Sequence, residues 1–131
     1  MLDSISLEQC TRRFRKETGL VAVWGFGSAF SDHMRSDSDV DFAALWDKDS
    51  PEDLVQIGKL ILDLESITGR TVDLGKLSTN NLIYAHEAIR LGKCVYARNQ
   101  SEADAFFARI CSLYADFKID RRVVENAYCA G

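Results

Sequence analysis

Two aspartates separated by one residue, Asp39 and Asp41, open an apolar run in the first third of the chain. In a strand, alternate side chains share a face, so both carboxylates point the same way, about 7 Å apart. Like charges at that distance repel each other unless solvent or a cation lies between them. Mg²⁺ suits this position, because it binds one or two carboxylates together with the phosphates of a substrate. The pair therefore indicates either a solvated sheet edge or a magnesium site.

A Gly-Ser pair, Gly27 and Ser28, stands ten residues before the aspartates and directly follows the apolar run of residues 21–26. Glycine permits close backbone approach, and the pair offers N–H and hydroxyl donors to a phosphate at a predicted helix start. Ser38, in the connector, is a further candidate for phosphate contact, although capping of a turn explains it more simply. A phosphate-binding bend next to paired carboxylates predicts nucleotide chemistry.

A third aspartate, Asp73, lies in the apolar segment TVDLGKL. A carboxylate in such a strand is costly if it is buried without a partner. If this strand lies beside the one that carries Asp41, Asp73 completes a set of three carboxylates, enough to hold two Mg²⁺ ions for phosphoryl or nucleotidyl transfer. The alternative is an exposed aspartate on an edge strand.

The elements that must position these residues follow from periodicity and from helix start and stop signals. A capping box at Ser6 and Gln9 predicts the first helix start, Ser50 is predicted to cap the third helix, and Ser78 or Thr79 the fourth. Helices are predicted at residues 6–18, 29–34, 51–68, 79–91, 101–118 and 120–129, and strands at 20–26, 40–46, 70–74 and 94–97. This order indicates an α/β or α+β fold, a small sheet backed by helices, in one domain spanning residues 1–131.

Composition limits the partners. The chain has 131 residues and a net charge of −4, so general attraction to nucleic acid is not expected, and the basic cluster at residues 12–16 is most simply a solvated helix face. No apolar run is long enough to cross a membrane, and no apolar segment typical of a signal peptide follows Met1. The four cysteines form no CxxC pair, so we expect buried free thiols in the cytoplasm rather than a zinc site.

Gly27-Ser28, ten residues, then Asp39-Val40-Asp41 resembles the signature of the polymerase-beta-type nucleotidyltransferases, and more narrowly that of the minimal nucleotidyltransferase (MNT) antitoxins. The third acidic strand with Asp73, and the helix that leads into GKCVYAR, also resemble that group. The resemblance covers roughly residues 20–98 and implies a polymerase-beta-like fold.

The resemblance implies a specific activity. Many such antitoxins are encoded with a HEPN-domain ribonuclease toxin and transfer AMP from ATP to a tyrosine hydroxyl of that toxin, sometimes repeatedly. Gly27 and Ser28 would then hold the triphosphate, and Asp39 and Asp41 would bind two Mg²⁺ ions. Asp73 would bind the catalytic ion and help to deprotonate the hydroxyl.

Two alternatives stay open. A transferase that acts on a small molecule would need room for an additional substrate domain, which 131 residues hardly provide. A non-catalytic antitoxin could inhibit its partner by stoichiometric binding, although all three acids of the signature are present. The chain's own tyrosines could also accept AMP, and the sequence singles out none of Tyr84, Tyr96, Tyr114 and Tyr128.

Overall fold

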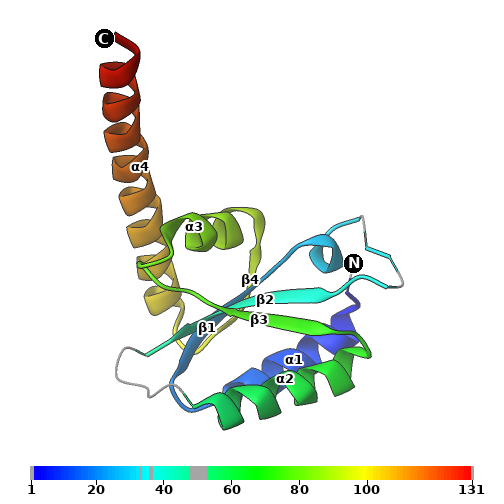
Figure 1. The fold of residues 1–131 in the computed structure, drawn as a ribbon. Coiled ribbons are helices and arrows are strands. Elements are labelled where there is room, and N and C mark those ends of the chain that lie inside the picture. The colour runs from blue at the N-terminus through cyan, green and yellow to red at the C-terminus, as the bar shows by residue number, and fades with distance from the viewer. Residues whose placement is uncertain (1, 33, 36, 48–52, 131) are drawn as a thin grey trace.

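Four strands form one mixed sheet with helices on both faces (Figure 1). The computed structural model describes residues 2–32, 34–35, 37–47 and 53–130, with side chains up to Arg122. Its elements are α1 (Ser4–Arg15), β1 (Leu20–Phe26), the 3₁₀ turn η1 (Ser28–Phe30), β2 (Val40–Trp46), α2 (Leu54–Thr68), β3 (Val72–Lys76), α3 (Leu82–Leu91), β4 (Lys93–Ala97) and α4 (Gln100–Ala130).

The strand order is β3-β2-β1-β4. β1 runs antiparallel to both β2 and β4, whereas β2 and β3 are parallel. The parallel pair is possible because α2 provides the crossover between them. Consequently β2 and β3 begin at the same end of the sheet. The predicted small mixed sheet backed by helices is confirmed.

Each face of the sheet has its own core. α1 and α2 cover one face, with Phe14 and Leu60 packed on Val40 and Phe42. α3 and the first half of α4 cover the other, where the buried residues are Val21, Ala22, Trp24, Ala43, Leu77, Ala85, Ala88, Ile89, Ala103 and Ile110. Alternation along β2 therefore sends Val40 and Phe42 to the first face and leaves Asp41 on the second.

Helix starts were predicted less well than strands. Asp3, not Ser6, caps α1, and its carboxylate accepts the N–H of Ser6 at 2.7 Å. Asp53 caps α2, while the predicted cap Ser50 lies outside the described residues. α3 begins at Leu82 after Asn81, later than predicted, because Leu77 still pairs with the sheet.

Three further expectations were wrong. The helix predicted at 29–34 is a single 3₁₀ turn, and the strand predicted at 70–74 runs from Val72 to Lys76, because pairing with β2 sets its register. The two C-terminal helices predicted are one continuous helix, α4.

No helix in the described part of the chain is both long and apolar enough to span a membrane.

The cysteines and the basic cluster also differ in part from expectation. Cys10 is buried, as predicted, whereas Cys111 is half-buried and Cys94 is exposed; all three are free thiols, and the Cys129 side chain lies outside the described residues. In the basic cluster, Arg12 is exposed and pairs with Glu8 on the surface of α1, as a solvated helix face predicts. Arg13 differs, because it pairs with Glu17, which follows α1, and with Asp63 of α2.

Candidate active site

The three predicted carboxylates gather where β2 and β3 begin. In the parallel register Asp41 is the direct partner of Asp73, so the two side chains project from the same face. Asp39 lies one residue before β2. Asp41 is half-buried, whereas Asp39 and Asp73 are exposed. The parallel pairing, which the sequence did not reveal, brings Asp73 beside Asp41.

The electrostatics of Asp41 reflect this crowding. Burial raises the pKa of the Asp41 carboxyl, and the negative charges of Asp73 and then Asp39 raise it further. Among the described residues, no three histidine, cysteine or acidic side chains converge closely enough to form a metal site by themselves. Mg²⁺ does not require such a cluster, because it completes its octahedron with water and substrate phosphates. An all-oxygen donor set in which burial and two neighbouring charges raise the pKa of Asp41 fits a divalent cation.

The Gly27 bend contacts the same carboxylate. β1 ends at Phe26, the partner of Asp41 in the antiparallel register, and Gly27 then adopts φ 81° and ψ −168°, a conformation open to glycine almost alone. A Cβ on Gly27 would lie 2.5 Å from Oδ2 of Asp41. Glycine is therefore needed both for the turn and for the approach of backbone to carboxylate.

Ser28 and Ser38 occupy different positions. Ser28, half-buried, begins η1 directly after Gly27, the residue that approaches the Asp41 carboxylate. Ser38 closes a turn in the connector, because its Oγ accepts the N–H of Arg35 at 2.7 Å. The guanidinium of Arg70 donates to the carbonyls of Arg35 and Ser38, which fixes the connector against the start of β3. Ser38 therefore caps a turn, which was the simpler of the two roles considered for it. It lies beside Asp39 in a hollow of about 190 Å³.

Tyr84 on α3 also faces this group, which the sequence did not single out. Its hydroxyl rests so close to Gly75 that a Cβ there would collide with it. Burial raises the pKa of the Tyr84 phenol, as do the charges of Asp73 and then Asp41. Gly75 lies two residues after Asp73 on β3, and this i, i+2 spacing in TVDLGKL was the signal that a side chain from another element could approach there.

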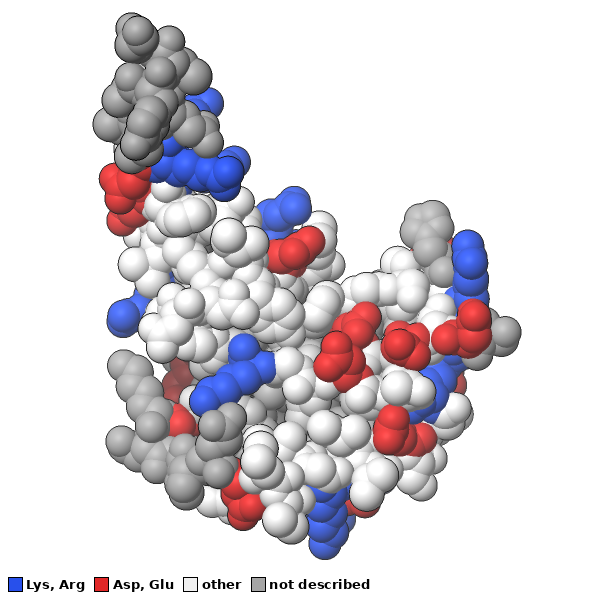
Figure 2. Space-filling model, viewed as in Figure 1, with Lys and Arg blue, Asp and Glu red and all other residues white. Residues whose placement is uncertain are grey.

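The surface around these residues is acidic and hollowed. Figure 2 shows acidic side chains gathered over the beginnings of β2 and β3, beside a concavity between α3 and η1. The acids that influence one another electrostatically there are Asp39, Asp41 and Asp73. An anionic triphosphate would enter such a surface only together with cations.

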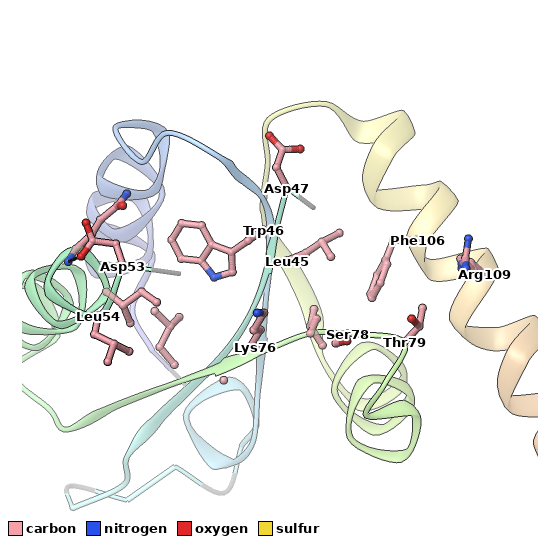
Figure 3. Close-up of a pocket in the computed structure, with 15 residues that line it drawn as sticks. Leu45, Trp46, Asp47, Asp53, Leu54, Lys76, Ser78, Thr79, Phe106 and Arg109 are labelled. Carbon is pink, nitrogen blue, oxygen red and sulfur yellow. Dashed lines mark hydrogen bonds between the residues drawn. The ribbon is translucent and has the colours of Figure 1, made fainter. Parts of the chain in front are cut away.

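A larger pocket of about 450 Å³ opens at the other end of β2 and β3 (Figure 3). Apolar side chains such as Leu45, Trp46 and Phe106 line it, together with the basic Lys76 and Arg109. None of the predicted site residues lines this pocket. Because it is separate from the carboxylates, its size does not make it the site of nucleotide chemistry.

Comparisons with known proteins agree with this geometry. The model of the family described as polymerase beta, nucleotidyltransferase matches residues 8–101. No curated protein matches the sequence significantly. Among solved structures, the chain is similar to one in a toxin–antitoxin crystal structure with AMP-PNP, with a TM-score of 0.71 and 20% identity over 95% of this chain and 96% of that chain.

Two other structures are comparable. A chain of the MntA–HepT toxin–antitoxin structure has a TM-score of 0.71 and 19% identity over 97% of this chain and 99% of that chain. A chain from a tri-AMPylated Shewanella oneidensis HEPN toxin in complex with MNT antitoxin has a TM-score of 0.68 and 20% identity over 95% and 96%. At such identities the likeness establishes the fold alone. The family match spans most of the chain, including the Gly27 bend and all three carboxylates, and the chain therefore belongs to the polymerase beta nucleotidyltransferase family.

Proposed function

We propose that the protein is a Mg²⁺-dependent adenylyltransferase antitoxin, which transfers AMP from ATP to a tyrosine of a partner HEPN toxin and thereby neutralises it. The observation that best supports the proposal is the position of Asp41, in contact with the Gly27 bend on one side and paired in register with Asp73 on the other. This order offers a place for a triphosphate beside the bend and for an attacking hydroxyl beside Asp73.

Each site residue has a role in the proposal. Gly27 and Ser28 contact the triphosphate, with Ser38 as a weaker phosphate contact through its turn. Asp39 and Asp41 would hold two Mg²⁺ ions, and Asp73 would help to hold one of them. When bound, Mg²⁺ would supply stabilisation of negative charge on the α-phosphate and on the departing pyrophosphate. Burial and the charges of Asp73 and Asp39 raise the Asp41 pKa, which supports this assignment, because a cation would offset them.

The acceptor proton needs a base. A tyrosine hydroxyl has a pKa of about 10, so few molecules are ionised at neutral pH without help. Asp73 is exposed at the edge strand of the sheet, where a hydroxyl from another protein can reach it. We assign to Asp73 the task of orienting that hydroxyl and accepting its proton.

The partner and the nucleotide are supported by the structures similar to this chain. One contains AMP-PNP, and another contains a tri-AMPylated HEPN toxin together with an MNT antitoxin. We propose that the chain acts as one domain in the cytoplasm, where free thiols such as Cys94 remain reduced. A macromolecular partner also suits a small protein whose carboxylates are open to the surface.

The test is incubation of the chain with labelled ATP, Mg²⁺ and the HEPN toxin. Label is expected on the toxin, and Asp39→Asn and Asp41→Asn are each expected to reduce it by roughly two orders of magnitude. Asp104→Asn, an exposed acid at the start of α4, is the matched control and is expected to retain activity.

The same experiment separates the alternatives. Toxin inhibition that survives both Asp39→Asn and Asp41→Asn, without label on the toxin, would favour a stoichiometric binding antitoxin. Transfer of label to an aminoglycoside but not to the toxin would favour a small-molecule transferase. Either result would refute the proposal.

A further inference from the structure

We propose that Tyr84 is a self-modification site, which accepts AMP from ATP when no partner tyrosine is present. The inference rests on the proposed function, because it uses the same carboxylates and the same nucleotide. It assigns an acceptor within the chain itself, at the position beside the carboxylates that the partner's tyrosine would otherwise occupy.

Two contacts, one with β1 and one with β3, place the Tyr84 side chain across the face of the sheet. Its ring packs against Phe26 in a T-shaped arrangement, with ring centroids 6.1 Å apart. Its hydroxyl is seated on the backbone at Gly75, where any larger residue would displace it. Because Asp73 and Gly75 are two residues apart on one strand, they share a face, and the hydroxyl lies over the face that carries the carboxylates.

The hydroxyl is on the acceptor side of the site. The Gly27 bend touches Asp41 from β1, whereas the Tyr84 hydroxyl lies at Gly75 of β3, on the other side of β2. A nucleotide held at the bend would therefore lie across the strand of Asp41 from the Tyr84 hydroxyl, with Asp73 on the strand beneath that hydroxyl. This is the order that the proposed transfer requires of an incoming tyrosine.

The other described tyrosines lie elsewhere. Tyr96 is buried in the core on the opposite face of the sheet, beside Phe14. Tyr114 stacks on His86 at 3.6 Å between ring centroids, on the α3–α4 side. The Tyr128 side chain is outside the described residues. Tyr84 is thus the one, among the three described tyrosines, that faces the carboxylates.

The chemistry balances with ATP as the co-reactant. The Tyr84 Oη attacks the α-phosphorus, a phenol–phosphorus bond forms, and the bond from the α-phosphorus to the bridging oxygen of pyrophosphate breaks. Pyrophosphate leaves with that electron pair, and the phenolic proton passes to Asp73 and then to solvent. The product carries one AMP on Tyr84, which would fill the space above the carboxylates and limit further turnover.

The first experiment incubates the purified chain with ATP and Mg²⁺ without the toxin, followed by intact mass measurement and peptide mapping. The wild type and the control Tyr114→Phe are expected to gain one adenylyl group at Tyr84. Tyr84→Phe is expected to gain none. Modification of a different residue, or equal modification of Tyr84→Phe, would overturn the inference.

A parallel reaction with the toxin present distinguishes this inference from the proposed function. Adenylylation of the toxin without any modification of Tyr84 in its absence would overturn the inference and leave the proposed function standing. Modification of neither protein would overturn both. Modification of Tyr84 alone would support the inference and refute the assigned partner.

A second readout needs no turnover. Nitration by tetranitromethane reports whether the Tyr84 ring is accessible, and a non-reactive ATP analogue with Mg²⁺ is expected to slow nitration of Tyr84 at least threefold and leave Tyr114 unchanged. Equal nitration rates with and without the analogue would place Tyr84 outside the nucleotide site. Failure of Tyr84 to be nitrated in the free chain would also count against an accessible acceptor.

Discussion

The surroundings of Asp41 disfavour the ionised form of its carboxyl group. Burial and two neighbouring carboxylates favour its neutral form, although a neutral carboxyl group holds no cation. A protein that needed only a stable sheet would place an apolar or amide side chain there. The unfavourable charge is consistent with a ligand that compensates it, which is the physical core of the proposed magnesium site.

The first prediction follows from that charge. Since folding raises the pKa of Asp41, the folded state binds the proton more tightly, and wild-type stability falls as pH rises from the ordinary aspartate pKa through the raised one. Asp41→Asn removes this loss. Without divalent cations it is expected to melt at a higher temperature than the wild type at pH 7, with the difference disappearing near pH 3. Calorimetry across this pH range checks it, and an Asp41→Asn variant that is less stable at pH 7 would contradict it.

The second prediction concerns Gly27. Because its φ of 81° with ψ −168° is open to glycine almost alone, Gly27→Ala is expected to lower the free energy of unfolding by about 1–3 kcal/mol. It should also weaken ATP binding, because its Cβ would push the Asp41 carboxylate aside. Urea unfolding and calorimetric titration measure the two effects.

Gly58 is the matched control for Gly27. It lies inside α2, and no atom beyond its own turns of the helix comes within 4 Å of the position that a Cβ would take, so Gly58→Ala is expected to stabilise the protein by about 0.5–1 kcal/mol. Equal changes in the free energy of unfolding for Gly27→Ala and Gly58→Ala would show that the conformation of Gly27 is not the cause of the loss.

Single residues could be predicted where the signal was local. Asp39, Asp41 and the Gly27–Ser28 pair stand in one short stretch, so their types and spacing sufficed. Tyr84 could not be singled out, because its position depends on a contact between α3 and Gly75 of β3, and no local pattern connects the two.

Among the elements, α1 and α2 form the support beneath the carboxylate strands. A cluster of polar side chains, partly buried, joins the two helices. Arg13 pairs with Glu17 at 2.7 Å and with Asp63 of α2 at 2.7 Å, and the Gln56 amide donates to Glu17. Glu17 is only 8% exposed, so its carboxylate depends on these partners.

The third prediction tests this connection. Arg13→Ala would leave the buried Glu17 carboxylate without its cation and is expected to cost about 3 kcal/mol of unfolding free energy. The neighbouring Arg12 pairs with Glu8 on the surface, so Arg12→Ala is expected to cost less than about 0.5 kcal/mol. Equal losses in urea unfolding would show that burial of the ion pair has no effect.

The bounds of the helices and strands could be predicted only in part. β1 and β2 were predicted with their observed bounds, because their apolar runs end at polar or glycine residues. The cap of α1 and the start of β3 were predicted wrongly. Asp3 accepts the N–H of Ser6 and so starts the helix before the predicted cap. The bounds of β3 depend on pairing with β2, which the sequence of β3 does not specify.

In the whole molecule, α4 is the least compact part. Its first half packs on α3 and the sheet through Ala103 and Ile110, and its second half extends away from the sheet (Figure 1). Ile119 is 59% exposed, and the described side chains after it are exposed too. Stability should therefore come from the first half of this helix.

The fourth prediction divides α4 accordingly. Ile110→Ala is expected to lower the free energy of unfolding by about 2–5 kcal/mol, because it leaves a cavity in the second core. Removal of residues 119–131 is expected to shift the melting temperature by less than about 2 °C. A large loss on truncation would indicate that the extended part packs on the body.

The fold class could be predicted from the order of elements, but strand pairing could not. The sequence is compatible with several placements of β3, and only the parallel pairing of β2 and β3 puts Asp73 next to Asp41. The whole proposal for this protein depends on that pairing.

The most direct test is a crystal structure of the chain with Mn²⁺ in place of Mg²⁺ and a non-hydrolysable ATP analogue, with the metals located by anomalous scattering. The account predicts metal positions bounded by Asp39, Asp41 and Asp73, with the triphosphate against Gly27 and Ser28. Manganese bound elsewhere, or Asp73 turned away from the metal and the α-phosphate, would contradict it.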